Sequence, residues 1–125
     1  MVRVPAARIL VIDDDPKVVD LLMLRLREEG YGILRALTGD AGVKLAIASR
    51  PDLVVLDLTL PGMLGIDVLK HLRTINPTIK VIVVSGNIDP ALAREALELG
   101  ALAYVDKPFD IGYLKRVIAM ALASM

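Results

Sequence analysis

Residues 53–61 have the sequence LVVLDLTLP, and this stretch decides the fold. Four apolar residues precede Asp57, and the turn-forming residues Pro61 and Gly62 follow. A short, continuous apolar run bounded by turn residues is typical of a strand that is buried on both faces. We therefore expect a strand at Leu53–Leu56 that ends at Asp57 and lies inside a covered sheet.

Short apolar runs alternate with longer helical segments on both sides of this strand. The predicted strands are Ile9–Ile12, about 32–36, Leu53–Leu56, Ile79–Val84 and Leu102–Val105. The predicted helices are 16–29, about 40–49, about 66–74, Pro90–Leu99 and Ile111–Ala123. Such alternation gives a parallel sheet with helices on both faces, joined by right-handed crossovers. We predict an α/β fold, a flavodoxin-like (βα)5 doubly wound parallel sheet with strand order 2-1-3-4-5.

Residues at the predicted helix ends support these boundaries. Asp15 and Asp89 each precede a proline, the pattern of an N-cap acceptor followed by proline at the first helical position. Asp110 is placed to cap the last helix, with Phe109 and Leu114 spaced as a hydrophobic staple. In the first helix, the predicted buried face carries Val18, Leu22 and Leu26, and Gly30 is the predicted stop.

The composition excludes several functional classes. The chain has 125 residues, no net charge and no cysteine. The charge balance argues against direct binding of nucleic acid, and the lack of cysteine excludes disulfides, thiol nucleophiles and thiolate metal ligands. No apolar run approaches the roughly 18 residues of a membrane span, and the N-terminus has no signal-peptide core. We expect a cytoplasmic protein forming one domain over 1–125, with a core at about 8–122 and no output domain.

Polar residues follow four of the predicted strands. Asp13 and Asp14 follow the first strand, Asp57 the third, Ser85 the fourth and Lys107 the fifth. Ligands of open α/β sheets bind outside the carboxyl ends of the strands, so these five side chains should converge there. The alternative is that each has a local role, as a solvated loop acid, a turn serine or a surface lysine. Their joint arrangement favours a shared site.

Clustered carboxylates require a cation. A pair of like charges at 4 Å costs about 1 kcal/mol in water and about 4 kcal/mol at an effective dielectric constant of 20. Carboxylate oxygens and water suit Mg²⁺, whereas no His or Cys is offered for zinc. Phosphoryl transfer depends on positioning and on neutralising charge, which a metal ion, Lys107 and Ser85 would provide. Asp57 would then be the nucleophile that forms an acyl phosphate.

At this point the chain resembles the receiver domains of bacterial two-component response regulators, from Arg8 to about Leu122. The resemblance implies a phosphoacceptor role for Asp57. It also implies that Asp14 and Asp57 bind Mg²⁺, or Mn²⁺ in its place, through their side chains, Asp13 through water and Thr59 through its backbone carbonyl. The matching segments are Ile9–Asp15, Val54–Pro61, Val83–Gly86 and Tyr104–Phe109.

The resemblance further implies a set of switch residues. Ser85 is expected to move to the phosphoryl group, and Tyr104 is expected to turn inward on activation. Lys107 is expected to pair with a phosphoryl oxygen, and its peptide bond to Pro108 is expected to be cis. Thr59 and Asn87 are expected to face the phosphoryl group and to tune its hydrolysis. The sequence departs from the family pattern at Leu64, where an Asp or Asn is usual, and we expect this departure to be neutral for phosphorylation.

The expected function is two-component signal transduction. A sensor histidine kinase or histidine phosphotransfer protein would donate the phosphoryl group, and a downstream protein would bind the altered surface of a monomer or weak phosphorylation-dependent dimer. We expect no turnover of external substrates. A phosphatase of the haloacid dehalogenase class needs a second acid where this chain has Thr59, and a flavodoxin would not place Asp13–Asp15 against a phosphate. A degenerate receiver that acts as a phosphorylation-independent interaction module remains the alternative.

Overall fold

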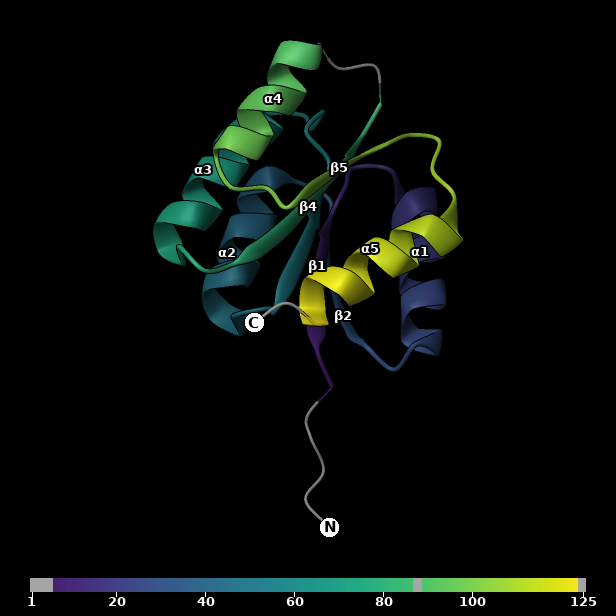
Figure 1. The fold of residues 1–125 in the computed structure, drawn as a ribbon. Helices are drawn as coiled ribbons and strands as arrows, with labels where there is room; N and C mark the ends of the chain where they lie inside the picture. The colour runs from purple at the N-terminus through teal and green to yellow at the C-terminus, as the bar shows by residue number, and fades with distance from the viewer. Residues whose placement is uncertain (1–5, 87–88, 124–125) are drawn as a thin grey trace.

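The computed structural model describes residues 6–86 and 89–123, which form a five-stranded parallel sheet flanked by helices (Figure 1). The strand order is β2-β1-β3-β4-β5, so the predicted topology is confirmed. The strands are β1 Arg8–Ile12, β2 Gly32–Ala36, β3 Leu53–Leu56, β4 Lys80–Ser85 and β5 Ala103–Asp106. The helices are α1 Pro16–Glu28, α2 Gly39–Ser49, α3 Gly65–Ile75, α4 Pro90–Glu98 and α5 Ile111–Ala123.

The sheet divides the apolar interior into two layers. Helices α2, α3 and α4 cover one face, and α1 and α5 cover the other (Figure 1). Successive residues of a strand point to opposite faces, so Leu10 and Ile12 pack under the first group of helices while Ile9 and Val11 pack under the second. All four side chains are fully buried, and this explains why the strands are almost wholly apolar.

The predicted helix caps are present. The side chains of Asp15 and Asp89 accept hydrogen bonds from the backbone N–H groups of Lys17 and Ala91, at 3.0 Å and 2.8 Å. Asp110 likewise accepts a bond of 2.7 Å from the N–H of Gly112. These bonds satisfy N–H groups that have no partner within the helix, which is why the helices begin where they do.

The structure differs from the prediction by one residue at several places. In α1 the buried residue of the first turn is Val19, whereas Val18 is only partly buried. Strand β4 includes Ser85, so its predicted end at Val84 was one residue early. Strand β5 begins at Ala103 and not at the exposed Leu102. Within the part of the chain that the structure describes, no helix is both long and apolar enough to cross a membrane.

The parallel register brings the carboxyl ends of the strands to one edge. Ladder hydrogen bonds continue one residue past the strand ends: the N–H of Asp13 donates to Ala36, that of Asp57 to Ile12, and that of Lys107 to Ser85. The corresponding N···O distances are 3.1, 2.9 and 3.1 Å. The backbone therefore fixes the bases of three charged side chains at the same edge of the sheet.

Candidate functional site

Asp57 lies at the centre of the cluster that the sequence predicted. Its side chain is 3% exposed and follows directly from β3. Oδ1 accepts hydrogen bonds from Thr59, through the backbone N–H at 2.9 Å and the hydroxyl at 2.8 Å, and from the Ser85 hydroxyl at 2.9 Å. Oδ2 accepts a bond from the Lys107 ammonium at 2.9 Å. The carboxylate is therefore held in one orientation by donors from three loops or strands.

Lys107 bridges two buried acids. Its Nζ atom lies 2.7 Å from Oδ2 of Asp13 and 2.9 Å from Oδ2 of Asp57. Both carboxylates are buried, so the lysine supplies the positive charge that buried anions require. The sequence predicted that Lys107 would join this site, but it gave no sign of the contact with Asp13.

The two buried acids differ in their protonation equilibria. Burial alone would raise the pKa of Asp57, but hydrogen bonds from Lys107, Thr59 and Ser85 outweigh it and lower this pKa below its usual value. Burial raises the pKa of Asp13, and the bond from Lys107 offsets this only in part. Burial would lower the pKa of Lys107, but the two carboxylates reverse that effect and raise it. Asp57 is therefore kept as the anion, the form that a nucleophile requires.

The carboxylates also form a group with the chemistry of a metal site. One oxygen each from Asp13, Asp14 and Asp57 lies within 4.8 Å of the others, and Asp14 is exposed to solvent. Three hard oxygen donors, one of them open to water, fit the ligand set that Mg²⁺ prefers. Asp15 lies apart from this group because its side chain caps α1, while its backbone N–H donates to Asp13 at 2.9 Å.

The predicted switch residues meet at one carbonyl oxygen. The carbonyl of Ser85 accepts hydrogen bonds from the Tyr104 hydroxyl at 3.0 Å and from the Lys107 N–H at 3.1 Å. Ser85 is fully buried, and Tyr104 is partly buried against the layer under α2, α3 and α4. The Lys107–Pro108 bond is cis, as expected. Asn87, predicted to face the phosphoryl group, lies outside the described residues.

The side chain of Thr59 makes a contact with Asp57 that the sequence did not predict. We predicted a backbone carbonyl ligand at this position and a side chain that faces the phosphoryl group. The structure shows the hydroxyl bonded to Asp57, in an Asx-type turn that begins at Asp57. The signal available in the sequence was the Asp-x-Thr spacing, since such acids often bond to a hydroxyl or N–H two residues later.

The fold and the acidic pocket at the ends of the strands define a protein of the response regulator class. Residues 9–119 match the family model for the response regulator receiver domain, and the chain belongs to this family. Receiver domains are switches of two-component signal transduction and bind Mg²⁺ at an acidic pocket of this kind.

Two curated relatives illustrate the similarity. Sporulation initiation phosphotransferase F of Bacillus subtilis (strain 168) is 36% identical over 111 residues, which cover 89% of this chain and 90% of that protein. Transcriptional regulatory protein KdpE of Mycobacterium tuberculosis (strain ATCC 25618 / H37Rv) is 45% identical over 103 residues. That match covers 82% of this chain but only 45% of KdpE, so the chain spans less than half of that relative.

Solved structures show the same fold. The CheY-like receiver domain protein of Methanospirillum hungatei JF-1 superposes with a TM-score of 0.93 at 30% identity, covering 95% of each chain. A response regulator of Chloroflexus aurantiacus J-10-fl has a TM-score of 0.88 at 29% identity, covering 95% of this chain and 99% of that one. The similarity therefore extends over nearly the whole chain in both structures.

Proposed function

We propose that this chain is a Mg²⁺-dependent phosphoacceptor switch that receives a phosphoryl group on Asp57 from a histidine kinase or a histidine phosphotransfer protein. The observation that supports this most strongly is the environment of the Asp57 carboxylate, which is buried, anionic and bonded to Thr59, Ser85 and Lys107. These three donors are also the groups that phosphoryl oxygens need as negative charge shifts onto them.

The proposed phosphoryl transfer forms one bond to phosphorus and breaks another. A carboxylate oxygen of Asp57 forms a bond to phosphorus, and the phosphorus–nitrogen bond of the donor phosphohistidine breaks. The electron pair of that bond leaves with the imidazole of the donor. The lowered pKa of Asp57 keeps the carboxylate ready for this attack, while Lys107 and the Ser85 hydroxyl remain beside the product to bind its oxygens.

Asp13, Asp14 and Asp57 are the side chains that would hold the metal ion, with the Thr59 carbonyl as the proposed backbone ligand. A bound Mg²⁺, or Mn²⁺ in its place, supplies charge neutralisation for the phosphoryl oxygens. The exposure of Asp14 leaves this side of the pocket open to solvent and to an incoming donor.

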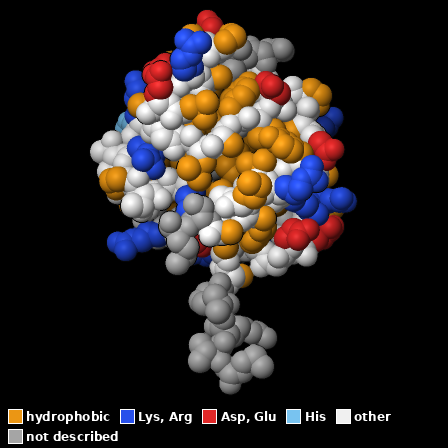
Figure 2. Space-filling model, in the orientation of Figure 1, with side chains coloured by type: hydrophobic (Ala, Val, Ile, Leu, Met, Phe, Trp, Pro, Cys, Tyr) orange, Lys and Arg blue, Asp and Glu red, His pale blue; other side chains and the backbone are white. Residues whose placement is uncertain are grey.

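We propose that the surface whose partner binding changes on phosphorylation lies on α4, β5 and α5, next to Tyr104. Figure 2 shows hydrophobic side chains gathered on this face of the molecule. Leu102, Tyr113 and Met120 line one hollow of the β5 and α5 surface, and all three are exposed. Phosphorylation adds roughly −1.5 to −2 units of charge beside Ser85. A movement of Ser85 would change the position of Tyr104, because the Tyr104 hydroxyl donates a hydrogen bond to the Ser85 carbonyl. Binding of a downstream protein, or of a second copy, would follow from that change.

The proposed chemistry is tested by intact-mass spectrometry after incubation with acetyl phosphate. We expect the wild type to gain one phosphate in the presence of Mg²⁺ and none after chelation, and Asp57→Asn to gain none under either condition. A phosphate retained by Asp57→Asn would assign the modification to another residue. A wild type that is not phosphorylated even by histidine kinases would instead support a phosphorylation-independent interaction module.

A further inference from the structure

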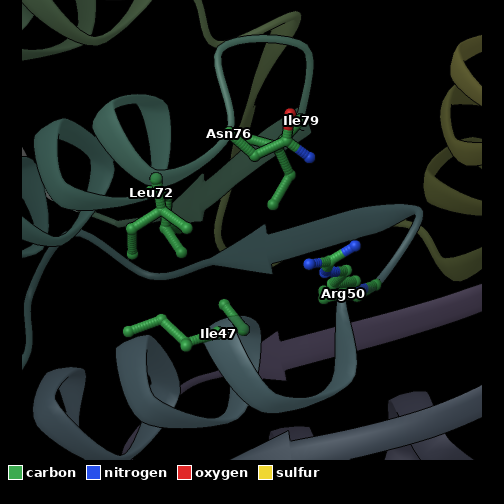
Figure 3. A pocket seen from close by; sticks show the side chains of 8 residues that line it. Ile47, Arg50, Leu72, Asn76 and Ile79 are labelled. Carbon is green, nitrogen blue, oxygen red and sulfur yellow. The ribbon is translucent and has the colours of Figure 1, made fainter.

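We propose that the pocket between the C-terminal ends of α2 and α3 binds an aliphatic carboxylate, at a site separate from Asp57. The pocket has a volume of about 390 Å³, within the range of ligand sites in proteins. Figure 3 shows it from close by, with Ile47 on α2 facing Leu72 on α3. Its lining residues are Ala46, Ile47, Arg50, Pro51, Leu72, Ile75, Asn76 and Ile79.

The walls of the pocket are aliphatic. Two of the isoleucines that line it, Ile47 and Ile75, are exposed to solvent. Leu72 and Ile79 are buried and close the pocket against the sheet layer under α2, α3 and α4. These side chains offer an apolar surface, and an alkyl chain that binds there would remove this surface from water.

Two donors at one end of the pocket, on Arg50 and Asn76, are accessible to an anionic acceptor. Among the described residues, no carboxylate lies within salt-bridge distance of the Arg50 guanidinium, and that guanidinium donates to no protein acceptor. The Oδ1 atom of Asn76 accepts from the N–H of Thr78 at 3.1 Å and from its hydroxyl at 2.8 Å.

This pairing fixes the orientation of the Asn76 amide. The backbone N–H of Thr78 can only donate, so the amide atom facing it must be oxygen, and the NH₂ group points elsewhere. In Figure 3, Asn76 and Arg50 lie toward one end of the pocket while Leu72 lies toward the other. An amide NH₂ and a guanidinium beside an aliphatic pocket match a carboxylate joined to an alkyl chain.

The backbone at Arg50 is held in an uncommon conformation, which fixes the position from which its side chain starts. Arg50 ends α2 in the left-handed region, with φ 48° and ψ 65°, where glycine or asparagine is usual. A residue with a Cβ is strained in this conformation. Pro51 disfavours the helical alternative at residue 50, and the Arg8 guanidinium donates to the carbonyls of Ser49 and Arg50, so the conformation is held from both sides.

This site lies at the opposite end of β3 from Asp57. The pocket borders the start of that strand, at Pro51, whereas Asp57 follows its last residue. The pocket and the phosphoacceptor cluster share no residue. Binding here can therefore be tested independently of phosphorylation.

The test is a titration of the full 125-residue chain with octanoate, followed by amide chemical shifts in two-dimensional NMR spectra. We expect saturable shifts centred on α2 and α3 residues that line the pocket. The alcohol 1-octanol, which has the same chain but no charge, should bind at least about tenfold more weakly because it lacks the pair with Arg50.

Two variants that should fold normally test the donors. Arg50→Gly removes the guanidinium and suits the positive φ, and Asn76→Asp keeps the acceptor for Thr78 while replacing the NH₂ donor with a negative charge. Each should weaken octanoate binding about tenfold or more. Arg27→Gln, which removes an exposed arginine from α1 on the other face of the sheet, should leave binding unchanged. The absence of saturable shifts, equal binding of octanol, or full affinity in Arg50→Gly would each overturn the proposal.

Discussion

The ammonium of Lys107 lies 2.9 Å from Oδ2 of Asp57, although the two residues are 50 positions apart in the chain. The same ammonium contacts Asp13, so one cation offsets two buried carboxylates. Removal of one member of such a group leaves uncompensated charge, which costs more than the group itself contributes. Lys107 therefore has a structural role in the unphosphorylated protein, in addition to its proposed role in switching.

We predict that Lys107→Met destabilises the metal-free protein by about 2 kcal/mol, because Asp13 and Asp57 would face each other without a cation. Mg²⁺ should stabilise this variant more than the wild type, since the ion would replace the missing charge. Urea unfolding with and without Mg²⁺ measures both effects. Lys44→Met is the matched control, because the Lys44–Asp40 pair is exposed and contributes little. An unchanged free energy of unfolding in Lys107→Met would show that the bridge is energetically unimportant.

We predict that Leu64→Asp stabilises the protein by about 0.5–1 kcal/mol. Leu64 is the N-cap residue of α3, has an extended backbone at φ −62° and ψ 138°, and gives no side-chain cap bond. Its side chain is 63% exposed, so nothing in the interior is lost. Denaturant unfolding measures the free energy of unfolding of Leu64→Asp. The same measurement on Leu64→Ala separates the effect of the new cap from the effect of removing the leucine side chain. The rate of phosphorylation should stay the same, and a large change in that rate would show that this loop takes part in the chemistry.

We predict that Gly65→Ala destabilises the protein by about 2 kcal/mol and slows phosphorylation. A Cβ atom on Gly65 would lie 2.2 Å from Cα and 2.5 Å from the carbonyl oxygen of Leu58, and backbone atoms cannot rotate away. Separation of these segments would displace Thr59, which follows Leu58 and bonds to Asp57. Gly32→Ala is the control, because its nearest neighbour would be a side-chain carbon at 3.4 Å. Equal stability of the two variants would refute the close approach.

Tyr104 should titrate at unusually high pH. Burial, followed by the effect of Asp106, raises the pKa of Tyr104 to about 12, compared with an ordinary value of about 10. The folded state holds the proton more tightly, so the stabilisation is fully present below pH 10 and is lost as the pH rises toward 12. Tyrosinate absorbance of the wild type minus that of Tyr104→Phe isolates this residue. A midpoint near 10 in the difference curve, while the protein is still folded, would contradict the assigned environment.

Most of the fold could be predicted because the signals are local and repeated. Apolar runs such as Ile9–Ile12 and Leu53–Leu56 are buried on both faces, and aspartates before prolines mark the helix starts. The residues after the strands then indicated the site, since parallel strands deliver them to one edge. Val18 packs against the same layer as Leu22 and Leu26, as predicted, but the neighbouring Val19 is the more deeply buried of the two valines.

Contacts between distant side chains could not be predicted in the same way. The bond from Lys107 to Asp13 depends on the path of a flexible side chain across the pocket. The left-handed backbone of Arg50 depends on Pro51 together with the contact from Arg8, which lies 42 residues away. The roles assigned to Asp13, Asp14, Asp57, Thr59, Ser85, Tyr104 and Lys107, and the single-domain organisation, stay predictions for experiment.

The two apolar layers have a consequence for engineering. Leu69 and Leu114 are both fully buried, but one belongs to the layer under α3 and the other to the layer under α5. The two layers share no residue, and the energetic effects of substitutions at separate sites with no common partner usually add to within about 0.5 kcal/mol. Libraries that redesign the interior can therefore vary the two layers separately, and the best sequences from each can be combined in one chain without a joint search.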